Sequence, residues 1–295
     1  MKKILSLTAL ITLLGGGAFA NLRVVATVPN MGMLAREIGG DAVSVRVMAP
    51  PDRDAHYLEA RPSMMAALRR ADIVVAVGGE LEIGWLPAAI RGANNSRVQR
   101  GQPGNFEASD HVELIGAPSA LDRSMGDVHP HGNPHVYLDP ERLIAVGHAL
   151  ADRLAEIDRG NAELYLDNAE QLEREIGERV EKWRSQIDRE IGVLLYHEDL
   201  DYLLNMLDVR VLGHIEPLPG IPPTARHLRD LTSRLADIDG VVWTVDYQPE
   251  QGGYQVASQL GWDFHHLPAQ VSMRGSLADY LEMIDNWVQT IALRD

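Results

Sequence analysis

The sequence predicts an α/β fold of two lobes, each with a parallel sheet flanked by helices, joined by one long backbone helix. In both halves of the chain, apolar runs typical of strands alternate with helical patterns, which is the order expected of a parallel sheet covered on both faces. Between the halves, residues 161–187 carry a single apolar stripe at helical spacing. Because no sequence repeat relates the halves, two lobes and a connecting helix are the simplest arrangement.

The N-terminal half contains three predicted strands and two predicted helices. The strand segments are continuous or alternating runs rich in β-branched residues. The first helix is expected to end at Gly39-Gly40, since glycine is a common signal for the end of a helix. We expect strands at 22–28, 43–48 and 73–77, and helices at 31–38 and 63–70.

A long helical block follows Pro140, and its second part is expected to run from residue 161 to 187. Its apolar residues recur every three or four positions, which describes one stripe on a helix of roughly seven turns, or about 40 Å. A coiled coil is the alternative, but the stripe is too short to require one. The stripe consists of Tyr165, Ala169, Leu172, Ile176, Val180, Trp183 and Ile187.

The C-terminal half resumes the alternation and completes the division into domains. We expect a signal peptide at 1–20, an N-terminal lobe at 21–157, the linking helix at 158–188 and a C-terminal lobe at 189–295. The strands are expected at 193–196, 209–215, 241–245 and 263–267, and the helices at 200–207, 225–235, 252–260 and 276–292.

The first twenty residues have the pattern of a secretory signal. Lys2 and Lys3 precede an apolar segment, Ile4 to Leu14, that is too short to span a bilayer, and Ala18-Phe19-Ala20 is a small-x-small cleavage site. No cysteine follows the apolar segment, so we expect a cleaved periplasmic protein and not a lipoprotein.

Charge and cysteine content narrow the function classes. The formal net charge is −15, and loss of the two signal lysines makes it −17, which disfavours nucleic-acid binding. The chain has no cysteine, so disulfides, thiolate metal sites and cysteine nucleophiles are excluded. Any metal must therefore be held by histidine, carboxylate or backbone oxygen.

Two histidines follow predicted strands, where open parallel sheets carry their binding sites, and a third lies in a stiff loop. His56 follows the second strand, and His197 comes directly after residues 193–196. His135 lies in a loop stiffened by Pro134, before a predicted short strand at 136–138 and a helix capped by Asp139. Because they come from both lobes, we expect all three to face one cleft as metal ligands.

The chain resembles the zinc- and manganese-binding solute-binding proteins of bacterial ABC importers, the cluster A-I family. The likeness covers nearly the whole mature chain in motif order and implies the helical-backbone type of metal receptor, with His56, His135 and His197 as ligands. The motifs that carry it are Asp54 to Ser63, Ala71 to Val75, Gly84 to Pro87, Asn133 to Pro140, Tyr196 to Asp199 and Ile215 to Pro223.

Two departures from the family pattern concern the metal site. The usual fourth ligand, a carboxylate after the last strand, is replaced by His266-Leu267-Pro268-Ala269, so the fourth position is open to water, Glu216 or Asp246. The long His-rich insert of many zinc-specific relatives is reduced to Asp127-Val128-His129-Pro130-His131. This segment is either a weak secondary zinc site or a polar turn.

The resemblance implies capture of Zn(II) as transported ligand, with Mn(II) less favoured, and delivery to an ABC importer permease in the inner membrane. We expect a monomer, optionally loaded by a periplasmic zinc metallochaperone, and no enzyme activity. The alternatives are a periplasmic zinc buffer or metallochaperone, and a three-histidine zinc hydrolase with Glu198 as base. Metal affinity is expected to fall below about pH 6, as histidines protonate.

Overall fold

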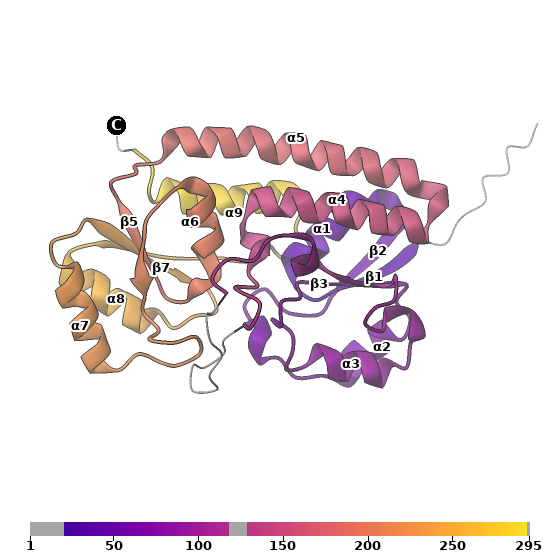
Figure 1. Ribbon diagram of the computed structural model, residues 1–295, viewed down its shortest axis with the longest axis horizontal. Coiled ribbons are helices and arrows are strands. Elements are labelled where there is room, and N and C mark those ends of the chain that lie inside the picture. The colour runs from indigo at the N-terminus through magenta and orange to yellow at the C-terminus, as the bar shows by residue number, and fades with distance from the viewer. Residues whose placement is uncertain (1–20, 118–128, 294–295) are drawn as a thin grey trace, which may run out of the picture.

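The computed structural model describes residues 21–117 and 129–293, so the predicted signal peptide lies outside the described residues. It contains two four-stranded sheets, ordered β2-β1-β3-β4 and β6-β5-β7-β8, and all paired strands are parallel. Each sheet lies in its own lobe, and helices cover the sheets (Figure 1). The predicted fold class is confirmed.

The N-terminal lobe contains all the strands and helices predicted between residues 22 and 77. It also contains one strand and one helix that the sequence pattern does not predict. The missed strand, β4, has only three residues, and the missed helix, α3, begins at Leu86-Pro87 after a run of turns. The elements are β1 (Leu22–Ala26), α1 (Pro29–Gly39), β2 (Val43–Val47), α2 (Pro62–Leu68), β3 (Ile73–Ala76), α3 (Leu86–Ala93) and β4 (Asn105–Glu107).

The C-terminal lobe follows the predicted alternation closely. Its strand β5 is fully buried, which explains the continuous apolar run that predicted it. The elements are β5 (Gly192–Leu195), α6 (Asp201–Leu207), β6 (Val211–His214), α7 (Ala225–Leu235), β7 (Gly240–Val245), α8 (Glu250–Leu260), β8 (Asp263–Leu267) and α9 (Leu277–Gln289).

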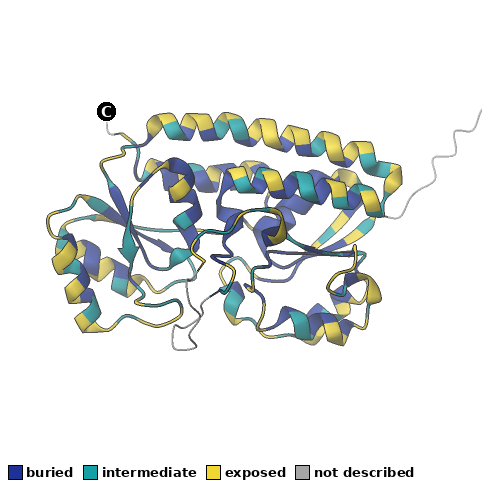
Figure 2. Ribbon diagram, in the orientation of Figure 1, coloured by how far each residue is buried: buried dark blue, intermediate teal, exposed yellow. Residues whose placement is uncertain are grey.

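Two antiparallel helices, α4 (Pro140–Ile157) and α5 (Ala162–Gln186), connect the lobes. Asp139 caps α4 as predicted, accepting hydrogen bonds from the amides of Glu141 and Arg142. Helix α5 packs on α4, α1 and α9, and its outer face is exposed (Figures 1 and 2). All seven residues of the predicted stripe are buried, from Tyr165 to Ile187.

The predicted strand at 136–138 is wrong, because Val136–Leu138 forms a 3₁₀ turn. The side chain of Asn133 accepts a hydrogen bond from the amide of His135 at 2.9 Å, which bends the chain before the apolar residues begin. The amide of Leu138 then bonds to the carbonyl of His135 at 3.1 Å. Local side-chain bonding thus replaces the strand partner that an extended segment would need.

The two lobes are held together by buried polar contacts at the start of α1. Asn30 is fully buried and donates from Nδ2 to the carbonyl of Ala269 at 3.0 Å, while its Oδ1 accepts from the amide of Val271 at 2.9 Å. Its own amide donates to Gln270 Oε1 at 3.0 Å. The segment after β8 is therefore fixed against the N-terminal lobe, which favours small movements over a wide hinge.

Asn30→Ala is expected to lower the free energy of unfolding by about 3 kcal/mol, because it leaves a buried amide and a buried carbonyl without partners. Urea unfolding of the metal-free protein measures this change. Asn205→Ala, at an exposed position of α6, is the matched control and should change stability by less than about 0.5 kcal/mol. Equal stability of the two variants would contradict the role given to Asn30.

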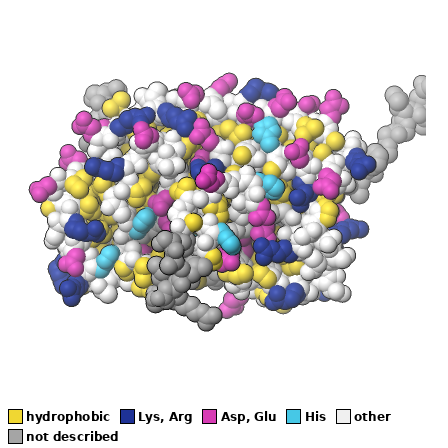
Figure 3. Space-filling model, in the orientation of Figure 1, with side chains coloured by type: hydrophobic (Ala, Val, Ile, Leu, Met, Phe, Trp, Pro, Cys, Tyr) yellow, Lys and Arg dark blue, Asp and Glu magenta, His cyan; other side chains and the backbone are white. Residues whose placement is uncertain are grey.

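Within residues 21–117 and 129–293, no helix is both long and apolar enough to cross a membrane. Acidic and basic side chains are interspersed over the face shown in Figure 3. The net negative charge is thus spread over this face, which agrees with a role in solubility.

Candidate metal centre

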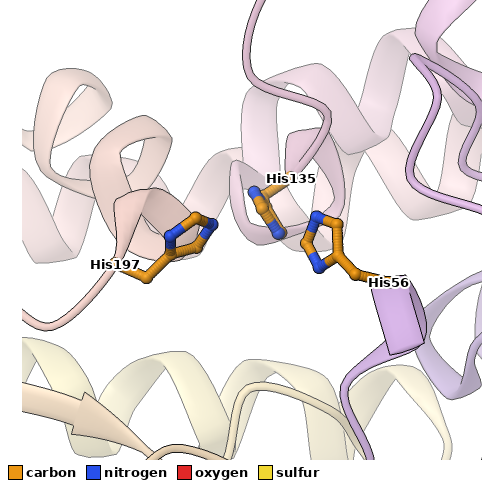
Figure 4. A group of neighbouring side chains, drawn as sticks. All are labelled: His56, His135 and His197. Atoms are coloured by element: carbon orange, nitrogen blue, oxygen red, sulfur yellow. The ribbon is translucent and has the colours of Figure 1, made fainter. Parts of the chain in front are cut away.

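The structure brings His56, His135 and His197 together between the lobes. One ligand atom from each ring lies within 4.8 Å of those of the other two. The ring centroids are 5.2 Å apart for His56 and His135, 5.9 Å for His56 and His197, and 5.5 Å for His135 and His197. Figure 4 shows His56 and His197 approaching from opposite sides, with His135 between them.

His56 lies on a 3₁₀ turn, Ala55–Tyr57, that Asp54 caps. Asp54 Oδ1 accepts from the amide of His56 at 2.9 Å and contacts its ring Nδ1 at 2.6 Å. The buried Trp85 donates from Nε1 to the carbonyl of Ala55 at 2.8 Å, which fixes the turn from behind. With Nδ1 occupied by a carboxylate, Nε2 is the nitrogen that can bind a metal.

His135 is held by a similar arrangement, in the loop that leads into α4. Its side chain is 1% exposed, and Nδ1 contacts Asn133 Oδ1 at 2.8 Å. Asn133 is fixed in turn, because Tyr202 donates to its carbonyl at 2.6 Å and its Nδ2 donates to the carbonyl of Glu198 at 2.6 Å. Since an amide oxygen only accepts, the proton of His135 lies on Nδ1 and the lone pair of Nε2 faces the cluster.

His197 follows β5, and its Nδ1 contacts Glu216 Oε2 at 3.0 Å. The same carboxylate oxygen accepts from the amide of Gly220 at 3.0 Å. The Nε2 atoms of His197 and His135 are both buried, and neither has a hydrogen-bond partner among the described residues. Buried polar atoms are rarely left unpaired, so two such nitrogens facing one space indicate a ligand.

The local electrostatics differ from ring to ring. Burial lowers the pKa of His135 well below its ordinary value, and the neighbouring imidazoles lower it further. Burial also acts to lower the pKa of His197, but the hydrogen bond to Glu216 and the nearby Asp199 outweigh it and raise that pKa to about 9. Metal therefore competes with a proton at His197 well above the pH of about 6 that unperturbed histidines suggest.

Both sequence-derived candidates for a fourth ligand lie in other settings. Glu216 bonds the Nδ1 side of His197, so it supports that ring from behind. Asp246 follows β7, and its Oδ1 is buried without a hydrogen-bond partner within the described chain, but it is not grouped with the three histidines. Asp199 lies outside that group as well, but its Oδ1 is 3.6 Å from His135 Nε2.

His129 and His131, the two histidines of the shortened insert, separate in the structure. His129 is buried, and its Nε2 lies 3.1 Å from Nε2 of His56. His131 is exposed and lines a different cavity, at the ends of β3 and β4. Residues 127 and 128 lie outside the described residues, so the proposed secondary site is reduced to His129 beside His56.

Two of the three histidines, His56 and His197, border a cleft of about 260 Å³. Tyr57, Tyr247 and Pro249 also line it, so an ion can reach the cluster along a path with aromatic walls. Two other histidines are paired elsewhere: His148 contacts Glu173 at 2.7 Å, and His214 contacts Asp201 at 2.9 Å.

Comparison with known proteins agrees with this architecture. The zinc uptake protein ZnuA of Yersinia pestis is 25% identical over 233 residues, covering 74% of this chain and 73% of its own. The manganese ABC transporter substrate-binding lipoprotein PsaA of Streptococcus pneumoniae is 28% identical over 183 residues, covering 57% of this chain and 56% of its own. The nickel complex of FpvC from Pseudomonas aeruginosa superposes with a TM-score of 0.74 at 21% identity, covering 92% and 97%, which shows the shared fold.

A family profile described as zinc-uptake complex component A, periplasmic, matches residues 24–293, almost all of the chain outside the predicted signal peptide. The predicted resemblance is thereby confirmed, and the hydrolase alternative is set aside. The chain belongs to this family of periplasmic, metal-binding solute-binding proteins of ABC importers, which are not enzymes.

Proposed function

We propose that the protein captures Zn(II) through His56, His135 and His197 and delivers it to the membrane permease of an ABC importer. The observation that carries this proposal is the common orientation of the rings. Each Nδ1 contacts an oxygen acceptor, from Asp54, Asn133 or Glu216. The Nε2 atoms of His135 and His197 are left for the ion, and that of His56 would exchange its contact with His129 for it. Such oxygen-bonded imidazoles are the usual form of a histidine metal site.

The donor set supports zinc over manganese. Zn(II) accepts four-coordinate sites with three nitrogens and one oxygen, whereas Mn(II) prefers more carboxylate and water oxygens. Relatives with zinc, manganese and nickel in their names share this fold, so the donor atoms are the basis for the choice. Titration of the metal-free protein with zinc, in competition with a chelator, tests the choice and should give one tight site.

Capture and release follow from where the ligands lie. His56 belongs to the N-terminal lobe and His197 to the C-terminal lobe, so a bound ion bonds both lobes. Because buried contacts such as those of Asn30 already join the lobes, binding should order the loops and not swing a domain. Docking on the permease would release the ion by displacing one of these loops.

Delivery of zinc to the permease can be tested separately from zinc binding. In vesicles carrying the importer's permease and ATPase, zinc-loaded protein should stimulate ATP hydrolysis and zinc transport, and His135→Ala should not. A protein that binds zinc tightly but fails to stimulate transport would instead be a periplasmic zinc buffer.

Zinc binding at pH 7 is expected to release about one proton, taken from His197. Its pKa of about 9 means that the ring is protonated in the metal-free protein, while His135 is already neutral. Because the raised pKa favours the protonated form below pH 9, zinc affinity should fall about tenfold for each pH unit between 9 and 7. Calorimetry in two buffers with different ionisation heats counts the protons.

Glu216→Gln provides the matched test, because it removes the charge that raises the pKa of His197 and keeps the side-chain shape. Proton release at pH 7 should decrease in this variant, and its affinity should depend less steeply on pH. Zinc binding without proton uptake or release in the wild-type protein at pH 7 would contradict this account of His197.

A further inference from the structure

The buried carboxylate of Asp199 lies beside the ring of His135, near the other two histidines. We propose that Asp199 is the fourth ligand of the bound ion, through Oδ1. The inference rests on the proposed function, since it completes the same site. It also replaces the carboxylate that is missing after β8, where His266-Leu267-Pro268-Ala269 offers none.

The distance between Asp199 and His135 suits two ligands of one tetrahedral ion. Oδ1 lies 3.6 Å from Nε2 of His135, which has no hydrogen-bond partner in the described part of the chain. Zinc bonds of about 2.0–2.1 Å at tetrahedral angles separate two donor atoms by about 3.3–3.4 Å. This pair therefore needs to close by only a few tenths of an ångström. Asp199 is outside the group of ligand atoms that lie within 4.8 Å of one another in the metal-free structure, so we expect the loops that carry His56 and His197 to draw closer to it when the ion binds.

Asp199 is held in place by two residues of the loop after β7. Tyr247 donates its hydroxyl to Oδ1 at 2.5 Å, and Gln248 donates from Nε2 to Oδ2 at 2.5 Å. Gln248 is itself fixed, because its Oε1 accepts from the amide of Val245 at 3.0 Å. A carboxylate oxygen has two lone pairs, so Oδ1 can accept from Tyr247 and still bind an ion.

The charge of the bound ion gives a second, independent reason to assign Asp199 as a ligand. Three neutral imidazoles leave a zinc ion with two positive charges in a buried site, which is unfavourable without a compensating anion. The side chain of Asp199 is 3% exposed and adjoins the buried ring of His135. Asp54 and Glu216 contact the Nδ1 atoms, on the far side of their rings from the ion, so Asp199 is the carboxylate placed to neutralise it directly.

His129 is the competing fourth donor, because its Nε2 lies 3.1 Å from that of His56. A fourth imidazole would leave the full charge of the ion uncompensated. We therefore favour Asp199, and a variant of each residue separates the two.

The test is a zinc competition titration of four variants against the wild-type protein. Asp199→Asn keeps the shape and removes the charge, and it should weaken zinc binding by about 100-fold, the upper end of the loss when a supporting residue is mutated. Asp237→Asn, an exposed aspartate of the same lobe, should stay within threefold. His129→Ala should also stay within threefold, whereas His197→Ala should lose most of the affinity.

The outcomes separate the inference from the proposed function. If His197→Ala loses affinity but Asp199→Asn stays within threefold, or if His129→Ala takes the larger loss, Asp199 is not the ligand and the histidine site stands. If His197→Ala keeps its affinity, the proposed function itself fails.

A crystal structure of the zinc-loaded wild-type protein tests whether Asp199 is a ligand even if Asp199→Asn does not fold. It should place Asp199 Oδ1 about 2.0–2.2 Å from zinc, and a separation above about 3 Å would overturn the inference.

Discussion

Replacement of His135 by alanine is expected to lower the zinc affinity of the protein by at least about 100-fold, because loss of a ligand should cost no less than loss of a supporting residue. His135 lies between the other two histidines, and its Nε2 is buried without a hydrogen-bond partner among the described residues. Without the His135 ring, a bound ion would keep only the imidazole ligands of His56 and His197, which come from opposite lobes. Competition titration of the metal-free variant against a chelator measures the loss.

His148→Ala is the matched control for this prediction. His148 lies on the exposed side of α4 and contacts Glu173, so its loss should change zinc affinity by less than twofold. A decrease of less than tenfold for His135→Ala, in a variant that unfolds like the wild-type protein, would remove His135 from the site.

Trp183→Ala is expected to lower the free energy of unfolding by about 4 kcal/mol, the size of effect seen when a large buried aromatic side chain is truncated. Trp183 is fully buried in the stripe of α5, and its Nε1 donates to Asp285 Oδ1 of α9 at 2.5 Å. The substitution removes both the packing and this bond, so the contact between α5 and α9 is weakened, although Arg179 still bonds Asp285. Urea unfolding of the metal-free protein gives the change.

The neighbouring Lys182 is exposed, and Lys182→Ala should change stability by less than about 0.5 kcal/mol. If Trp183→Ala were as stable as Lys182→Ala, the buried stripe of α5 would not be what holds the connecting helix in place.

Burial explains which parts of the fold could be predicted from sequence. Strands such as β3 and β5 are buried on both faces, so they appear as continuous apolar runs. The stripe of α5 is equally visible, because one face packs and the other is exposed. By contrast, β4 has three residues with a single buried side chain, Phe106, and carries almost no pattern.

The three histidines could be predicted because each follows a strand or a family motif, but their supporting residues could not. Asn133 bends its own segment into a turn, and that local bond is invisible to a pattern of apolar residues. Asp199 lies in a family motif, but no sequence pattern assigns it a role, since its position depends on Tyr247 and Gln248, almost fifty residues away. Glu216 is a candidate fourth ligand from its sequence position, but it contacts the Nδ1 side of His197, which only three-dimensional contacts reveal.

The most direct test of the central claim is a metal competition titration on the wild-type protein and on a variant in which His56, His135 and His197 are all alanine. We expect the wild-type protein to bind one equivalent of zinc, and manganese at least about 1,000-fold more weakly, because three of its donors are imidazole nitrogens. The triple variant should show no tight zinc site. Tight binding of one zinc by the triple variant, or wild-type affinity for manganese within tenfold of that for zinc, would contradict the assignment of these three histidines to a zinc site.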